Sequence, residues 1–266
     1  MNTLERQMVD SLKDLRDNHN VIEVKTEFES EAARLNEVMR LKDVVGKADL
    51  GLVIKTGGPE AVRDMYDACL IGVTGIVAPM IESAFALKKY LTAINTFVPD
   101  DLKDYIHFAI NVETIQAVRN LDEILNVSGI ERLRRITVGR VDICGSLGLE
   151  RDDINCTQIF EIARTICQKS RARGLSTTMG GGIAREALPF IRKLAEEDLL
   201  DRFETRKIVF AIPPLFDDKH AEEGITEAAR FELMWLANKR NYYGRISKED
   251  EARIEMLDKR VGMTAT

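Results

Sequence analysis

The stretch FAINVETIQAVRNLDEILNVSGIERLRRITVGRVD, residues 108–142, decides the fold. It begins and ends with short apolar runs, residues 108–112 and 136–141, which are typical of strands buried on both faces. Residues 115–125 between them have the length and apolar spacing of a helix. A strand, a helix and a second strand at this spacing predict a right-handed βαβ unit in a parallel sheet.

The same alternation continues on both sides of this unit. Further strands are expected at residues 21–24, 50–54, 75–78, 175–179 and 208–212, and further helices at residues 29–45, 59–70, 83–95, 153–173 and 185–196. An eighth strand is not visible, so an open doubly wound sheet is the alternative. However, no GxGxxG motif follows the first strand, and polar residues end one strand after another, as at the C-terminal rim of a barrel. The sequence therefore predicts an α/β fold, a (β/α)8 TIM-type barrel that forms a single domain over residues 1–266 with an added N-terminal helix.

The pattern changes near the C-terminus. Residues 219–257 form a helical extension that we expect to contain two helices with no strand between them. Apolar and aromatic side chains are frequent there, namely Phe231, Met234, Trp235, Tyr242 and Tyr243. They either pack against the barrel of their own chain or form a contact between subunits.

Composition excludes several classes of protein. Lys plus Arg is 38 and Asp plus Glu is 44, a net charge of −6, which argues against a nucleic-acid binder with a basic face. The four cysteines form no CxxC pair, as expected in a reducing compartment. No signal segment and no run of about 18 apolar residues is present. We therefore expect a cytoplasmic enzyme that binds neither membrane nor nucleic acid.

Charged and polar side chains mark the ends of the expected strands, where residues two apart share a face. By strand they are Glu23, Lys25 and Glu27, then Lys55, then Asn111 and Glu113, then Arg140 and Asp142, and finally Glu204 and Arg206. Strands buried on both sides offer such groups no solvated face, and an unpaired buried charge is costly. The pattern predicts a polar pocket at one end of the barrel.

This pocket has the residues for metal-assisted chemistry. Glu113 and Asp142 can give two oxygen ligands to Mg²⁺ or Mn²⁺, with water and substrate completing the octahedron. A divalent ion that holds a 2-oxo acid acts as a Lewis acid and stabilises an enolate. Lys55 and Arg140 could neutralise an oxyanion or a substrate carboxylate. Each of these residues could also belong to a structural ion pair.

A run of glycines, MGGGI at residues 179–183, follows another expected strand. The backbone N–H groups of Gly180, Gly181 and Gly182 could receive an anionic part of a substrate. The alternative is a tight turn that needs positive φ angles, and both can hold together.

Three segments resemble a known family. IVAPMIES (76–83), FAINVETIQAVRNLDEIL (108–125) and ITVGRVDICGSLGL (136–149) resemble the HpcH/HpaI aldolase and citrate lyase β-subunit superfamily, and the resemblance extends over residues 21–210. It implies a modified TIM barrel that binds a divalent metal and makes or breaks a carbon–carbon bond next to an enolate. It also implies that Glu113 and Asp142 are the metal ligands and that a homo-oligomer forms through the C-terminal helices.

The chain differs from this family in the residue at the position of the catalytic base. Pyruvate aldolases of the family carry an Asp-Gly-Glu-His strand end whose His is the base, whereas the matching stretch here is KTEF, residues 25–28. The family's substrate-binding Arg on the next strand is replaced by Lys55, and Lys is not equivalent to Arg at a carboxylate. Glu27 acting through water, or a deprotonated Lys25 or Lys55, could replace the base.

The function expected from these residues is that of a metal-dependent carbon–carbon lyase, aldolase or synthase. Its small-molecule substrate would be an enolisable 2-oxo acid such as pyruvate, or a phosphorylated or sugar-derived relative. The expected catalytic residues are Lys55, Glu27, Arg140 and Lys25, and the expected substrate-binding residues are Asn111, Gly180, Gly181, Gly182 and Arg206. The alternatives are a citrate lyase β-like enzyme acting on a CoA thioester, or a non-catalytic barrel that binds an anion.

Overall fold

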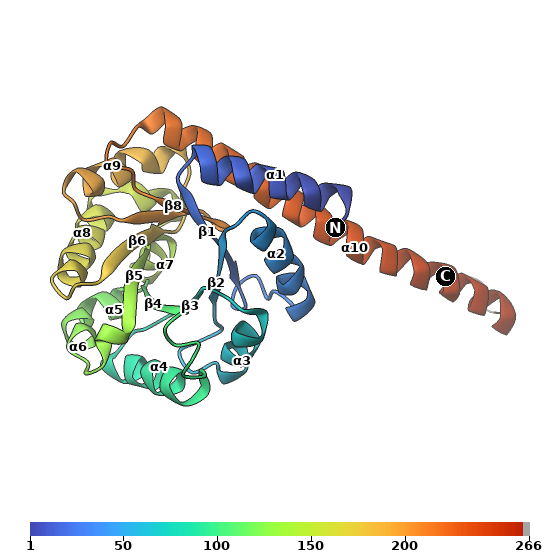
Figure 1. Ribbon diagram of the computed structural model, residues 1–266, viewed down its shortest axis with the longest axis horizontal. Helices are drawn as coiled ribbons and strands as arrows, with labels where there is room; N and C mark the ends of the chain where they lie inside the picture. The colour runs from blue at the N-terminus through green and yellow to red at the C-terminus, as the bar shows by residue number, and fades with distance from the viewer. Residues whose placement is uncertain (263–266) are drawn as a thin grey trace.

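The computed structural model describes residues 1–262. Over these residues the strands close into a barrel in chain order, which confirms the predicted TIM-type fold (Figure 1). The strands are β1 Val21–Glu27, β2 Gly51–Lys55, β3 Gly75–Ala78, β4 His107–Val112, β5 Leu133–Gly139, β6 Ser176–Gly180, β7 Arg202–Glu204 and β8 Ile208–Ala211.

The barrel closes through an antiparallel strand. Neighbouring strands from β1 to β7 run parallel, but β8 pairs antiparallel with both β7 and β1. Only residues 205–207 join β7 to β8, which is too short for a helical crossover, so the chain turns back as a hairpin. This corrects the expectation that every strand is parallel. It also identifies β7 as the strand that the sequence did not reveal.

Helices surround the barrel on its outer side (Figure 1). They are α1 Thr3–Asn18, α2 Leu35–Lys47, α3 Val62–Ile71, α4 Ala84–Phe97, α5 Ile115–Arg119, α6 Leu121–Leu125, α7 Arg140–Ser146, α8 Thr157–Arg171, α9 Leu188–Glu196 and α10 Asp218–Val261, with short 3₁₀ turns η1 Ile130–Arg132, η2 Arg151–Asn155 and η3 Arg185–Ala187. None of the helices described is both long and apolar enough to cross a membrane.

The C-terminal extension is one helix rather than the two expected. α10 is continuous over 44 residues, because no proline interrupts the segment. Its first half packs along α1 and buries Phe231 and Trp235. Its second half extends beyond the barrel (Figure 1) and exposes Ile254 and Leu257.

The interior of the barrel is apolar only at its middle. Val53, Val77 and Ala109 form a small cluster there, separate from the large core between the strands and the helices. Below it, at the N-terminal ends of the strands, Glu23 contacts His107 and Arg135. This corrects the expectation that Glu23 belongs to the pocket, because it lies near the start of β1 and the cavity lies at the end of that strand. The opposite end of the barrel holds the charged strand ends that were expected to form a pocket.

The strand β5 ends two residues earlier than the sequence suggested. It stops at Gly139, and α7 begins at Arg140. A Cβ atom on Gly139 would lie 2.5 Å from Cβ of Glu113, so only glycine lets β5 pass this close to the end of β4. Arg140 and Asp142 are therefore in the first turn of a helix and do not share a strand face.

Candidate active site

The C-terminal ends of the strands enclose a cavity of about 590 Å³. All of the predicted site residues except Arg140 line it, namely Lys25, Glu27, Lys55, Asn111, Glu113, Asp142, Gly180, Gly181, Gly182 and Arg206. They come from the ends of strands far apart in the sequence and from the segments that follow these strands, because parallel strands bring their carboxyl ends to the same rim.

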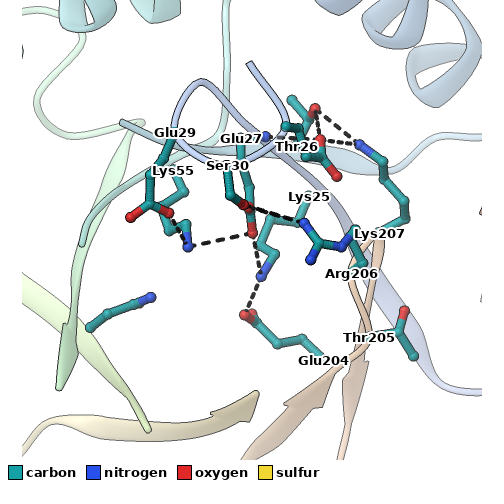
Figure 2. Close-up of polar contacts among 12 residues, drawn as sticks. Lys25, Thr26, Glu27, Glu29, Ser30, Lys55, Glu204, Thr205, Arg206 and Lys207 are labelled. Carbon is teal, nitrogen blue, oxygen red and sulfur yellow. Dashed lines mark hydrogen bonds and ion pairs between the residues drawn. The ribbon is translucent and has the colours of Figure 1, made fainter. Parts of the chain in front are cut away.

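A row of alternating charges crosses the β7, β1 and β2 side of the cavity (Figure 2). Lys25 Nζ lies 2.5 Å from Glu204 Oε1 and 3.4 Å from Glu27 Oε1. Lys55 Nζ lies 3.6 Å from the same Glu27 oxygen and 2.5 Å from Glu29 Oε2. We call these five residues the ion-pair ladder.

The ladder holds its two lysines in the charged form. Burial disfavours the ammonium of Lys25, but the attraction of Glu204 and Glu27 outweighs it and raises the pKa of Lys25. The pKa of Lys55 is raised in the same way, chiefly by Glu27 against the effect of burial. The expectation that either lysine serves as a deprotonated base is therefore corrected, because each is held as an ammonium by carboxylates.

Glu27 lies at the centre of the ladder. Burial opposes its ionisation, yet Lys25 and Lys55 lower its pKa to about 2. Its second oxygen, Oε2, accepts a hydrogen bond from Ser30 Oγ at 2.5 Å and lies 3.6 Å from Arg206 Nη1. Glu27 is thus a carboxylate throughout the neutral range.

A second buried pair packs next to the ladder (Figure 2). Lys207 pairs with Glu31 and donates a hydrogen bond to Thr26 Oγ1 at 3.1 Å. Thr26 in turn donates to Glu31 at 2.9 Å. These contacts join the β7–β8 turn to the loop after β1 and so fix one wall of the cavity.

Glu113 directly follows β4 and is only 2 % exposed. Its Oε1 accepts a hydrogen bond from the backbone N–H of Met80, and its Oε2 accepts one from Asn111 Nδ2, both at 2.9 Å. Burial raises the pKa of Glu113; the charge of Lys55 opposes this rise and the charge of Asp142 adds to it. Glu113 and Asp142 line the same cavity, and the charge of Asp142 disfavours the ionisation of Glu113.

Asp142 and Asn111 also line this part of the cavity. Within residues 1–262, Asp142 makes no ion pair, although burial raises its pKa against the charge of Lys55. Asn111 is 5 % exposed, and its Oδ1 has no hydrogen-bond partner in the described chain. Two carboxylate side chains and one amide side chain thus line the same cavity.

These oxygen donors fit a hard divalent cation. Mg²⁺ is commonly bound by one or two carboxylates, with water and substrate oxygens completing its coordination. Over residues 1–262 no group of three or more His, Cys, Asp or Glu side chains is arranged to hold a metal. The two carboxylates present, those of Glu113 and Asp142, therefore suit Mg²⁺ or Mn²⁺ and do not suit a closed structural zinc site.

Arg140 lies behind the cavity and not in it. Its fully buried guanidinium donates to Asn155 Oδ1 at 2.7 Å and to the carbonyl of Gly181 at 2.8 Å, and it lies over the ring of Phe190. Burial lowers its pKa to about 10. This corrects the expectation that Arg140 neutralises a substrate oxyanion directly, because helical periodicity from residue 140 turns it away from Asp142.

The sequence analysis did not identify three residues of the site. Glu29 and Ser30 follow β1 in a loop, where strand alternation makes no prediction, yet they bind Lys55 and Glu27. Met80 contributes only its N–H group, from a backbone with φ of 52°. No residue type marks that role, so only the fold could reveal it.

Comparison with solved structures supports the same architecture. An HpcH/HpaI aldolase from Desulfitobacterium hafniense DCB-2 aligns over 74% of this chain and 82% of its own, at 14% identity and a TM-score of 0.59. Citrate synthase SbnG aligns over 89% and 90% at 15% identity and a TM-score of 0.60. An HpcH/HpaI aldolase/citrate lyase family protein from Burkholderia cenocepacia J2315 aligns over 88% and 99% at 15% identity, with a TM-score of 0.58.

Sequence comparison gives the family. A search of curated proteins finds no match. The family model for HpcH/HpaI aldolase/citrate lyase, in contrast, matches residues 30–183, which is more than half of the chain and includes β2 to β6. With the closed barrel and the charged rim already described, this match shows that the chain belongs to the HpcH/HpaI aldolase/citrate lyase family.

Proposed function

We propose that this protein is a divalent-metal-dependent carbon–carbon lyase or aldolase whose substrate is an enolisable 2-oxo acid such as pyruvate. Family membership supports the coarser part, a carbon–carbon lyase or aldolase. The observation that carries the finer part is that Glu113 and Asp142 line one cavity, with the ammonium of Lys55 acting on both carboxylates.

Glu113 and Asp142 would hold Mg²⁺ or Mn²⁺. The bound ion would supply Lewis acidity to the carboxylate and ketone oxygens of the 2-oxo acid. Asn111 keeps the Glu113 carboxylate in place through its Nδ2 hydrogen bond. The N–H group of Met80 fixes the other oxygen of Glu113, so the position of this ligand is set before the substrate arrives.

Lys55 is proposed to stabilise the negative charge that develops on the substrate oxygen. Its ammonium is buried and held by Glu29 and Glu27, so it needs no reorganisation when charge develops. Glu27 is proposed as the proton acceptor, through a water molecule. Its pKa of about 2 makes it a weak base, so Glu27 would accept only a proton that is more acidic than that of free pyruvate.

The exchange of methyl protons in pyruvate tests this proposal. Incubation of the protein with pyruvate in D₂O and Mg²⁺, followed by ¹H NMR, reports enolisation without the second substrate. We expect the exchange to stop when EDTA is added. In Glu113→Gln the exchange rate should fall at least about 100-fold, because the loss of a metal ligand weakens the site no less than the loss of a residue that supports the ligand. The exposed Glu186 gives a matched control, Glu186→Gln, which should exchange at the wild-type rate.

Three outcomes would contradict the proposal. Exchange into acetyl-CoA but not into pyruvate indicates the CoA-thioester enzyme instead. Metal-independent exchange removes the role of Glu113 and Asp142. Neither exchange nor binding of Mg²⁺ by calorimetry indicates the non-catalytic, anion-binding barrel.

We also propose that the protein is a cytoplasmic homo-oligomer. The supporting feature for assembly is the second half of α10, which extends beyond the barrel and exposes the apolar side chains Ile254, Met256 and Leu257. Light scattering on the full chain tests this assembly. A monomeric mass at micromolar concentration would contradict it.

A further inference from the structure

One wall of the cavity is apolar. It is formed by Val141, Ile183, Ala184, Ile225 and Ala229, which all line the cavity, and we call these five residues the apolar wall. Ile225 belongs to the large hydrophobic core, and Val141 and Ile183 pack against the edge of that core. The β7, β1 and β2 side of the cavity, in contrast, carries the charged ion-pair ladder.

Contacts join the parts of this wall. A Cβ atom on Gly182 would lie 3.6 Å from Cγ2 of Val141, so the start of α7 packs against the glycine loop that precedes Ile183. Two residues further along the chain, Arg185 Nε lies 3.4 Å from Oε1 of Glu222 in α10. The loop after β6 is therefore held between the start of α7 and the first turns of α10.

The helix α10 faces the cavity with one stripe of side chains. Ile225, Ala229 and Glu232 are spaced four and three residues apart, as residues on one face of a helix are, and all three line the cavity. The stripe thus has two apolar side chains and one acid. Glu232 would repel a carboxylate or phosphate bound along the stripe, whereas an uncharged aliphatic group would be removed from water there.

The cations in the cavity lining offer little to an anionic group beside this stripe. Lys25, Lys55 and Arg206 contact carboxylates of the ladder. Arg151, at the start of η2, also lines the cavity but is exposed. An ion pair formed by an exposed side chain contributes little to binding.

The apolar wall begins next to the proposed metal site. Val141 directly precedes Asp142 in the first turn of α7, and both line the cavity. A partner that reacts with a 2-oxo acid held at Glu113 and Asp142 must bring its carbonyl group to this point. The rest of that partner can then extend along the wall. The cavity of about 590 Å³ is large enough for a ligand of drug size, so it has room for both molecules.

We propose that the apolar wall binds the second reaction partner, and that this partner is a neutral aldehyde or ketone with a short aliphatic chain. The inference deepens the proposed function and rests on it, because it needs a 2-oxo acid bound beside Asp142. Ile183, Ile225 and Ala229 are then residues that determine the specificity for this partner.

Binding of simple ketones to the full chain, without divalent cation, tests the wall directly. The protein carries ¹³C labels in the δ1 methyl groups of isoleucine, and propan-2-one, butan-2-one and pentan-2-one are titrated separately. We expect saturable NMR shifts at Ile183 and Ile225 and none at Ile246 and Ile254, which lie outside the cavity lining. The affinity should rise about fourfold for each added CH₂ group.

An anionic probe of the same length tests the charge of the partner. In 4-oxopentanoate a carboxylate replaces the terminal methyl group of pentan-2-one, and we expect it to bind more weakly than pentan-2-one. Equal or tighter binding of 4-oxopentanoate would overturn the proposal. An affinity that does not change with chain length, or no saturation up to about 100 mM pentan-2-one, would overturn it as well.

A variant that fills the space beside α10 tests the role of this helix. Ala229→Leu changes an exposed position of the wall, and we expect at least about fivefold weaker binding of pentan-2-one, the lower end of the cost of overpacking. Ala252→Leu, at an exposed position of α10 outside the cavity lining, is the matched control and should bind like the wild type. Unchanged affinity in Ala229→Leu would overturn the role of α10.

Pyruvate exchange is measured on the same samples, so that the two proposals can fail separately. Exchange without binding of the ketones would overturn this inference alone. Binding of the ketones without exchange would contradict the proposed function and would still support a site for neutral aliphatic ligands.

Discussion

The cluster at the closed end of the barrel gives a prediction that can be worked out from the structure. Glu23 Oε1 lies 3.1 Å from His107 Nε2, and its Oε2 lies 2.7 Å from Arg135 Nη1. The side chain is 12% exposed. Burial opposes ionisation, but His107 and Arg135 lower the pKa of Glu23 from 4.5 to about 2. The change we consider is Glu23→Gln, which removes the charge and keeps the shape.

The size of the effect follows from this pKa. A shift from 4.5 to about 2 corresponds to about 3 kcal/mol of unfolding free energy when Glu23 is ionised in both states. Because the folded-state pKa is the lower one, this stabilisation is present above the unfolded pKa and is lost as the pH falls through about 2. Glu23→Gln should therefore cost about 3 kcal/mol at pH 7 but only about 1 kcal/mol at pH 3.

Urea unfolding followed by circular dichroism at both pH values measures this difference. Glu186→Gln, at an exposed carboxylate, is the control and should change the unfolding free energy by less than about 0.5 kcal/mol. A loss of less than 1 kcal/mol at pH 7 for Glu23→Gln, or an equal loss at both pH values, would refute the reasoning. The cluster lies at the far end from the cavity, so the proposed pyruvate exchange should persist in the folded variant.

Three further predictions concern the site and the extension. Lys55→Met should lower the turnover number by about 10²–10³ with little change in the affinity for Mg²⁺, measured by steady-state kinetics and calorimetry; equal turnover would remove Lys55 from the mechanism. Gly181→Ala should cost about 1–3 kcal/mol in urea unfolding, since it forces a side chain to a φ of +81°, whereas a neutral result would contradict the backbone geometry. Deletion of residues 246–266 should give a smaller assembly in light scattering, and an unchanged mass would exclude the second half of α10 as the contact between subunits.

Strand periodicity was enough to predict most of the barrel. The apolar runs that became β1 to β6 are nearly continuous, as buried parallel strands must be. β7 has only three residues, two of them charged, so it has no apolar pattern from which a strand could be predicted. The direction of β8 depends on the turn at residues 205–207, and the sequence pattern of a strand contains no information about its direction.

Within the site too, the sequence pattern could place the metal-ligand candidates but not Arg140. Glu113 and Asp142 could be placed together because consecutive parallel strands end on one rim. Arg140 was misplaced because β5 ends at Gly139, so a helical rather than an extended period applies from there. The charge state of Lys25 could not be predicted, because its partner Glu204 is 179 residues away in the chain.

The central claim is that Glu113 and Asp142 together hold a divalent cation at the C-terminal mouth of the barrel. An anomalous-difference map from a crystal soaked in Mn²⁺ and oxalate tests it most directly. We predict one strong peak in contact with a carboxylate oxygen of each residue and with oxalate. A map with no peak between these carboxylates, or with manganese bound only elsewhere, would contradict the claim.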